Sequence, residues 1–152
     1  MLSDGSLRQT CSMLTASSVE ESRADIRSAA YRRKVGPGAL RTWFNIARAW
    51  RLTDRDAATL LGTGLSTYRR WKRNPQVTLD VGQMERLSLL LGIYKDLEIL
   101  LPRPDAADSW VRRENHNPLF GGRTPLDRML GGLTQDLVVV RRHLDAERGG
   151  WA

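Results

Sequence analysis

The stretch from residue 54 to residue 73, DRDAATLLGTGLSTYRRWKR, constrains the fold more than any other part of the chain. Two helices that cross closely need a small residue in the middle of the first, and Ala58 supplies it. The turn between them needs a positive φ angle, which Gly62 adopts without a Cβ clash. Tyr68 and Trp71 are spaced to lie on the inner face of the second helix. The spacing therefore predicts a helix-turn-helix.

The first helix of this unit has a predicted start and a predicted inner face of its own. Thr53 is suited to the N-cap, and Asp56 follows three positions later as an acidic version of the capping box. The apolar residues that face the second helix are Ala57, Leu60 and Leu61.

The outer face of the second helix is basic, and there is no acidic residue from Leu65 through Val77. In such units the second helix enters the major groove, where arginine pairs bidentately with guanine and hydroxyls contact phosphates or base edges. A solvated basic hairpin is the alternative interpretation. The residues that we expect to bind operator DNA are Ser66, Thr67, Arg69, Arg70 and Arg73, with Lys72 at the flank.

Composition agrees with an anionic partner, because the 152 residues carry a formal net charge of +7. No apolar run approaches the roughly 20 residues of a membrane span, so we expect no membrane association. The N-terminal sequence lacks the hydrophobic core of a signal peptide. Cys11 is alone, which excludes an internal disulfide. We therefore expect a cytoplasmic protein.

The hydrophobic periodicity predicts an all-α fold in three parts. Residues 1–34 are predicted to be a poorly ordered basic tail, because polar residues dominate and apolar ones are scattered. The cluster Arg32, Arg33 and Lys34 closes it, either as an arm on DNA phosphates or as an untethered end. Residues 35–101 form the predicted DNA-binding and dimerisation domain, and residues 102–152 form a second helical domain.

Within the middle part, Gly36-Pro37-Gly38 is predicted to be a break. A helix from Ala39 to about Arg51 should follow, with an apolar stripe that includes Trp43 and Trp50. An aromatic stripe at this spacing is more often core than a stacking platform, so we expect both indoles to pack against the helix-turn-helix.

Two further helices are predicted, from about Asp80 to Leu91 and from Ile93 to Leu101, after Asn74-Pro75 ends the second helix of the motif. The run from Leu87 to Leu101 is more apolar than a small monomer needs. We interpret part of it as the interface of a homodimer, and the alternative is that it closes the core of one chain.

The last part begins with a predicted linker, Pro102 to Asp105, and a helix that carries Trp110 and ends near Asn117-Pro118. A short helix should start at Thr124, with Pro125 at its first position, and the last helix near Thr134.

Several of these residues resemble the toxin-binding domain of Xre/MbcA/ParS-type antitoxins, and Arg69-Arg70-Trp71 in the helix-turn-helix is similar to the DNA-binding half of the same family. The resemblance covers about residues 37–152. The motifs that carry it are Trp110, Asn117, Gly121-Gly122, Thr124-Pro125-Leu126 and the terminal Gly149-Gly150-Trp151.

The resemblance implies a cognate toxin of the RES fold that destroys NAD; ParS-type members instead neutralise a related ADP-ribosylating toxin. It implies that the C-terminal end blocks the toxin's active-site cleft, and that the helix-turn-helix represses the shared operon, usually as a dimer. The residues nearest the cleft would be Arg148, Gly149, Gly150 and Trp151. Those that shape the domain would be Trp110, Asn117, Gly121, Gly122, Pro125 and Leu126.

The residues themselves allow this role, because a terminal tryptophan after two glycines is a large apolar anchor on a flexible hinge. The alternative for Trp151 is a terminus that docks on its own chain. His116 and His143 have no metal-ligand spacing, and no nucleophile neighbours a base, so we expect no catalytic residue, metal or cofactor. The alternative functions are a stand-alone helix-turn-helix transcriptional regulator with a dimerisation or sensing domain, and a basic RNA-binding or scaffolding protein.

Overall fold

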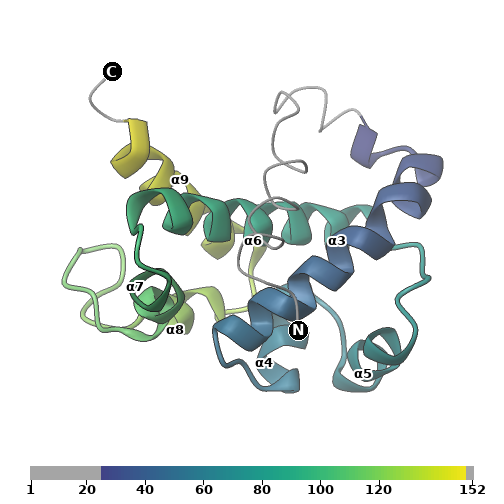
Figure 1. Cartoon of the computed structure of the whole chain (residues 1–152), viewed down its shortest axis with the longest axis horizontal. Helices are drawn as coiled ribbons and strands as arrows, with labels where there is room; N and C mark the ends of the chain where they lie inside the picture. Colours follow the sequence, from purple (N-terminus) through teal and green to yellow (C-terminus); the bar gives the residue numbers. More distant parts are fainter. Residues whose placement is uncertain (1–24, 150–152) are drawn as a thin grey trace.

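The computed structural model describes residues 25–149, and within this range the chain is helical without strands, which confirms the predicted all-α fold (Figure 1). No helix in the described range is both long enough and apolar enough to cross a membrane. The elements are α3 Ala29–Ala49, α4 Asp54–Leu61, α5 Leu65–Arg73, α6 Val81–Leu100, α7 Pro104–Ser109, the 3-10 helix η1 Trp110–Arg112, α8 Pro125–Met129 and α9 Thr134–Gly149.

Helix α6 packs against four other helices, α3, α4, α7 and α9. It contacts α3 and α4 along its first part, and α9 runs beside it (Figure 1). Trp43 and Trp50 are fully buried in the core, and their ring centroids lie 5.9 Å apart in an edge-to-face contact. The ring centroid of Trp50 also lies 6.4 Å from that of Tyr94. The two tryptophans are therefore core residues, as the sequence predicts.

Helix α3 is longer than the sequence predicts, and the predicted break at Gly36-Pro37-Gly38 is wrong. The helix starts after the N-cap Ser28, whose side chain accepts a hydrogen bond from the Tyr31 amide, and it continues through Pro37. Gly36 is buried against Val77, Leu79 and Met84. Packing on the segment before α6 thus outweighs the weak helix propensity of these residues.

The same helix includes residues 29–34, which the sequence assigned to a poorly ordered tail. Arg32 is one reason, because its Nε donates to the carbonyl of Leu79 at 2.8 Å and its Nη1 donates to that of Ile26 at 2.7 Å. Of the predicted basic cluster, Arg32 is thus bound within the chain, while Arg33 and Lys34 are exposed. The preceding residues 1–24 lie outside the described range.

Helix α6 is one continuous helix, and the predicted interruption between Leu91 and Ile93 is wrong. Asp80 caps it in a capping box with Gln83. Most of the apolar run that suggested a dimer interface is used inside the chain, although Ile99 is 49% exposed. The buried members are Leu87, Leu90, Leu91, Ile93 and Leu97. The homodimer stays a prediction.

The C-terminal part follows the sequence in its later elements. Helix α7 already starts at Pro104, inside the predicted linker, and Trp110 lies in η1 rather than in a helix that reaches Asn117. Helix α8 has the predicted Thr124 cap with Pro125 at its first position, and α9 begins at Thr134.

Candidate functional site

The helix-turn-helix has the geometry that its sequence predicts. The Thr53 hydroxyl accepts a hydrogen bond from the Asp56 amide at 3.1 Å, and Gly62 ends α4 in the left-handed region with φ 75°. The inner face of α5 buries Tyr68 and Trp71, which are 1% and 6% exposed. The Tyr68 ring contacts the Phe44 ring edge to face. Burial raises the pKa of the Tyr68 hydroxyl. Helix α5 is therefore held by its inner face, which leaves its outer face to solvent.

The outer face of α5 carries the predicted DNA-binding residues. Ser66, Arg69, Arg70 and Arg73 are exposed, and Thr67 is half-buried. All five therefore lie where a nucleic acid can reach them, and their assignment to DNA stays a prediction.

Asp54, at the start of α4, forms ion pairs with two basic residues of α5. The sequence did not predict these ion pairs. Lys72 Nζ lies 2.9 Å from Asp54 Oδ1, and Arg69 Nε lies 3.4 Å from Asp54 Oδ2. The hydrogen bond from Lys72, with Arg69 beside it, lowers the pKa of Asp54. The charge of α5 is therefore partly compensated next to the residues expected to meet phosphates.

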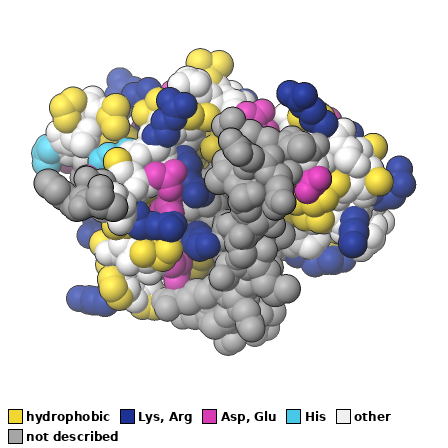
Figure 2. Space-filling model, turned by 90° about the horizontal axis from the view of Figure 1, so that it is seen from above, with side chains coloured by type: hydrophobic (Ala, Val, Ile, Leu, Met, Phe, Trp, Pro, Cys, Tyr) yellow, Lys and Arg dark blue, Asp and Glu magenta, His cyan; other side chains and the backbone are white. Residues whose placement is uncertain are grey.

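The start of α3 is also basic, and several Lys and Arg side chains lie at the right-hand end of Figure 2. The exposed Arg33 and Lys34 belong to this segment. Because the start of α3 and helix α5 lie at the same end of the molecule (Figure 1), both add positive potential there.

The C-terminal part contains a tight loop between η1 and α8, built from the residues of the predicted motif. Asn117 Oδ1 accepts from the Leu119 amide at 3.0 Å, and the Asn117 carbonyl accepts from the Phe120 amide at 2.9 Å. Gly121 and Gly122 then take φ angles of 56° and 78°, which favour glycine. These motif residues thus shape the loop.

Three aromatic rings fix the loop on the last helix. Phe120 is buried, and its ring meets Trp110 at 5.9 Å and His143 at 5.6 Å, both edge to face. His143 is half-buried in this stack. The sequence did not predict this contact.

The loop also leaves an open groove of about 320 Å³ on the surface. Leu119 is 38% exposed beside it, and Leu133, before α9, is 66% exposed. The groove is lined by Pro118, Leu119, Phe120, Gly121, Arg123, Asp127 and Arg128. This mixture of apolar and charged groups is typical of a protein-binding surface rather than of a closed substrate pocket.

Two arginines join the C-terminal part to the helix-turn-helix part. Arg112 donates from Nε to the Trp50 carbonyl at 2.7 Å and from Nη2 to the Arg51 carbonyl. Arg51, at the end of α3, has a φ angle of 56°. Arg86 donates to the Gly132 carbonyl at 2.8 Å, and its stem lies against Gly62. The two parts therefore have a defined orientation.

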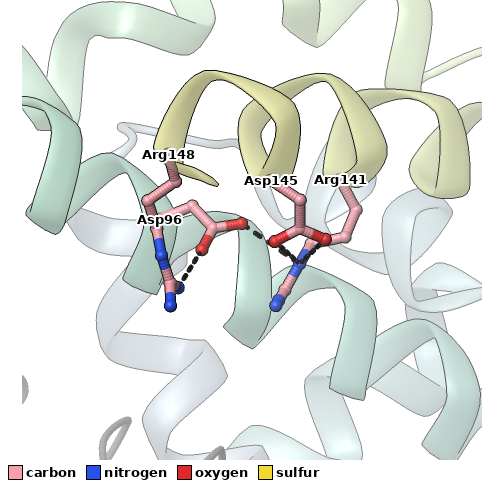
Figure 3. Close-up of polar contacts among 4 residues, drawn as sticks. All are labelled: Asp96, Arg141, Asp145 and Arg148. Atoms are coloured by element: carbon pink, nitrogen blue, oxygen red, sulfur yellow. Dashed lines mark hydrogen bonds and ion pairs between the residues drawn. The ribbon is translucent and has the colours of Figure 1, made fainter. Parts of the chain in front are cut away.

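An ion-pair cluster joins α9 to α6 (Figure 3). Asp96 on α6 is fully buried; Arg148 Nη1 lies 2.8 Å from its Oδ1, and Arg141 Nε lies 3.1 Å from its Oδ2. Arg141 Nε also lies 3.2 Å from Asp145 Oδ2. Burial raises the pKa of Asp96, and Asp145 adds to this, while the two arginines oppose it.

The sequence assigned Arg148, Gly149, Gly150 and Trp151 to partner binding. Arg148 has a 39% exposed side chain that binds Asp96, and Gly149 is the last residue of α9. Gly150 and Trp151 lie outside the described residues. The assignment of these four residues to a partner stays a prediction.

No group of three or more histidine, cysteine, aspartate or glutamate side chains within residues 25–149 has an arrangement that could hold a metal ion. His116 is exposed, and His143 lies in the aromatic stack already described.

Two protein-family models match the chain. Residues 28–92 match the antitoxin Xre-like helix-turn-helix domain, and residues 96–150 match the antitoxin Xre/MbcA/ParS C-terminal toxin-binding domain. The chain is also 44% identical over 115 residues to a protein of Sinorhizobium fredii (strain NBRC 101917 / NGR234) described as the uncharacterized protein y4oB. That alignment covers 75% of this chain and 87% of the relative.

The two matches define an antitoxin with a helix-turn-helix module in its first half and a toxin-binding module in its second. The chain belongs to the Xre/MbcA/ParS antitoxin family. The two modules meet inside α6, because the first match ends at Gly92 and the second begins at Asp96. Asp96 and its two arginine partners thus lie within the toxin-binding module.

Proposed function

We propose that this antitoxin neutralises a RES-type toxin that degrades NAD, by placing its C-terminal end, Arg148 to Trp151, in the active-site cleft of the toxin. The match of residues 96–150 to the toxin-binding domain carries the proposal. The chemistry of the end supports it, because Trp151 follows Gly149 and Gly150 and offers a large apolar group that an interface pocket can enclose. The exposed Leu119 and Leu133 add apolar contact area on the same module.

Removal of residues 150–152 tests the neutralising role. We expect the truncated protein to bind the toxin encoded beside its gene more weakly and to leave cellular NAD depleted when the two are co-expressed. DNA binding should be unchanged, because α5 lies in the other module. The measurements are the toxin affinity and the NAD content of the cells. Full neutralisation by the truncated protein would refute the idea that the end blocks the cleft.

We also propose that the helix-turn-helix represses the operon that encodes both proteins, with α5 in the major groove of the operator. Ser66, Thr67, Arg69, Arg70 and Arg73 are the expected contacts. As a homodimer, the protein would present two such helices roughly 34 Å apart, one helical turn of DNA. The exposed basic outer face of α5 supports this role.

Replacement of Arg69 and Arg70 by alanine tests the assignment to DNA. We expect weaker binding to the promoter DNA of the gene, and a salt slope reduced by about one unit for each lost phosphate contact. If the contacts are to bases, the loss should instead appear as relaxed specificity, on the order of 1–3 kcal/mol for each. Arg142→Ala removes an exposed arginine of α9, in the other module, and is the matched control. Unchanged promoter binding would contradict the assignment.

The alternative is a stand-alone transcriptional regulator whose second half dimerises or senses a ligand. It predicts promoter binding without affinity for the neighbouring gene product. A pull-down with that product therefore separates the two functions.

A further inference from the structure

We propose that Arg148 is a positioning residue for neutralisation: its ion pair with the buried Asp96 fixes the last turn of α9 on α6, so that the residues after Gly149 leave the toxin-binding module from a defined place. The inference deepens the proposed function and rests on its claim that the C-terminal end enters the toxin. It differs from that claim in one respect, because it assigns Arg148 to the antitoxin's own architecture instead of to direct toxin contact.

The ion pair between Arg148 and Asp96 joins the end of α9 to a buried group of α6. Arg148 lies one residue before the end of α9, yet its guanidinium reaches back to a carboxylate that is 52 residues away in sequence, at 2.8 Å. Asp96 is 0% exposed, so a toxin cannot replace Arg148 at this carboxylate without opening the contact between α6 and α9. In Figure 3 the Arg148 side chain points from the end of α9 toward α6.

The two arginines around Asp96 lie at different positions along α9. Arg141 lies in the middle of α9 and contacts Asp96 and Asp145 together. A Cβ on Gly92 would lie 1.2 Å from Arg141 Nη1, so the absence of a side chain at position 92 lets this arginine lie across α6. Arg141 thus holds the body of α9, and Arg148 holds its last turn.

Fixing the end of a helix costs conformational entropy. The last turn of a helix lacks intrahelical partners for its carbonyls and tends to fray. A binding segment that starts from a frayed turn loses more conformational freedom when it binds than one that starts from a fixed turn. An ion pair to a buried carboxylate at the last turn lowers this cost before the toxin arrives.

A cycle of four proteins tests the inference: the full chain, Arg148→Ala, the chain that ends at Gly149, and the combination of the two changes. The readout is the affinity for the toxin encoded beside the gene, with the melting temperature measured in parallel. We expect Arg148→Ala to weaken binding roughly tenfold in the full chain and to have little effect in the truncated chain. Arg148→Lys, which keeps the charge facing Asp96, should restore part of the affinity.

The outcomes separate the possible roles of Arg148. An equal loss in both backgrounds would mean direct contact with the toxin and would overturn the inference. So would an unchanged affinity of Arg148→Ala in the full chain, even if its melting temperature fell. Arg142→Ala on the same helix removes an equal charge from an exposed position and should leave the affinity within about twofold.

The proposed function fails separately. If the chain that ends at Gly149 bound the toxin as tightly as the full chain, both the blocking of the cleft and the positioning role would be lost. If the truncation weakened binding while Arg148→Ala did not, only the positioning role would be lost. Asp96→Asn is a second variant that removes the partner charge from a site that the toxin cannot touch, and it should reproduce the loss seen with Arg148→Ala.

Discussion

Asp54 is a single carboxylate that compensates part of the positive charge on the outer face of α5. It occupies the first turn of α4, where a negative charge interacts favourably with the helix dipole, and it binds Lys72 and Arg69 on α5. The contacts orient the two basic side chains. They also place a negative charge where phosphates are expected. Asp54 thus favours the fold and is expected to oppose DNA binding.

Asp54→Asn is therefore expected to raise the affinity for non-specific DNA several-fold and to steepen its salt dependence, since each phosphate neutralised adds about 0.9 to the slope. Asp56→Asn is the matched control, because it makes the same change of net charge in the same turn of α4. Titration of both variants with promoter and random DNA at several salt concentrations measures the effect. Equal affinity gains in the two variants would show that only net charge matters.

The lowered pKa of Asp54 also fixes the sign of a pH effect. The charged form is favoured in the folded state, so its contribution to stability is present above the ordinary value of 3.8 and is lost as the pH falls through the lower pKa of the folded state. We expect the free energy of unfolding, measured with urea between pH 2 and pH 6, to fall more steeply with decreasing pH for the unchanged protein than for Asp54→Asn. The difference should appear in the acid range. Parallel curves would contradict the ion pairs.

At the scale of elements, the sequence predicts those parts of the fold that local patterns determine. The Thr53 and Thr124 caps, the Gly62 turn and the inner face of α5 all depend on residues within one or two turns of each other. Two of the errors are at Gly36-Pro37-Gly38 and Gly92, where distant residues decide. Gly36 packs on the segment before α6, and Gly92 lies under Arg141, so neither glycine ends a helix.

Residues of the candidate sites could likewise be predicted only where a local pattern determines their position. The outer face of α5 follows from helical periodicity, so its exposed residues could be predicted. Asp96 could not, because a lone aspartate in an apolar helix has no local feature that identifies partners 45 or more residues away. The same holds for Arg112, which binds the end of α3 from the other module.

Gly92 and Gly38 provide a prediction about helix packing. Both lie inside helices, where alanine normally gains about 0.5–1 kcal/mol over glycine. Gly38→Ala should show this gain, because nothing lies within 4 Å of the added Cβ. Gly92→Ala should instead destabilise the protein by about 1–3 kcal/mol, because the Cβ displaces Arg141 and leaves the buried Asp96 with a poorer partner. Urea unfolding measures both, and a gain in both variants would refute the packing of Arg141 over Gly92.

At the scale of the whole molecule, α6 is shared by the two modules. Its first part completes the core of the helix-turn-helix, and its last part carries Asp96 and packs on α9. Arg112 and Arg86 add hydrogen bonds across the same junction. Because no flexible linker separates the modules, we expect the described chain to unfold as one cooperative unit, as most single domains under 150 residues do.

Two equivalent caps test this cooperativity. Thr53 caps α4 in the first module, with its hydroxyl 3.1 Å from the Asp56 amide, and Thr124 caps α8 in the second, 3.0 Å from the Asp127 amide. Alanine at either position should cost about 1 kcal/mol. If α6 couples the modules, each substitution should lower the protection of slowly exchanging amides in both α3 and α9 by the same amount in hydrogen-exchange mass spectrometry. A loss confined to the substituted module, or two separate unfolding transitions, would show that the modules are independent. Toxin bound to the second module would then have no route through the fold to the DNA-binding helix.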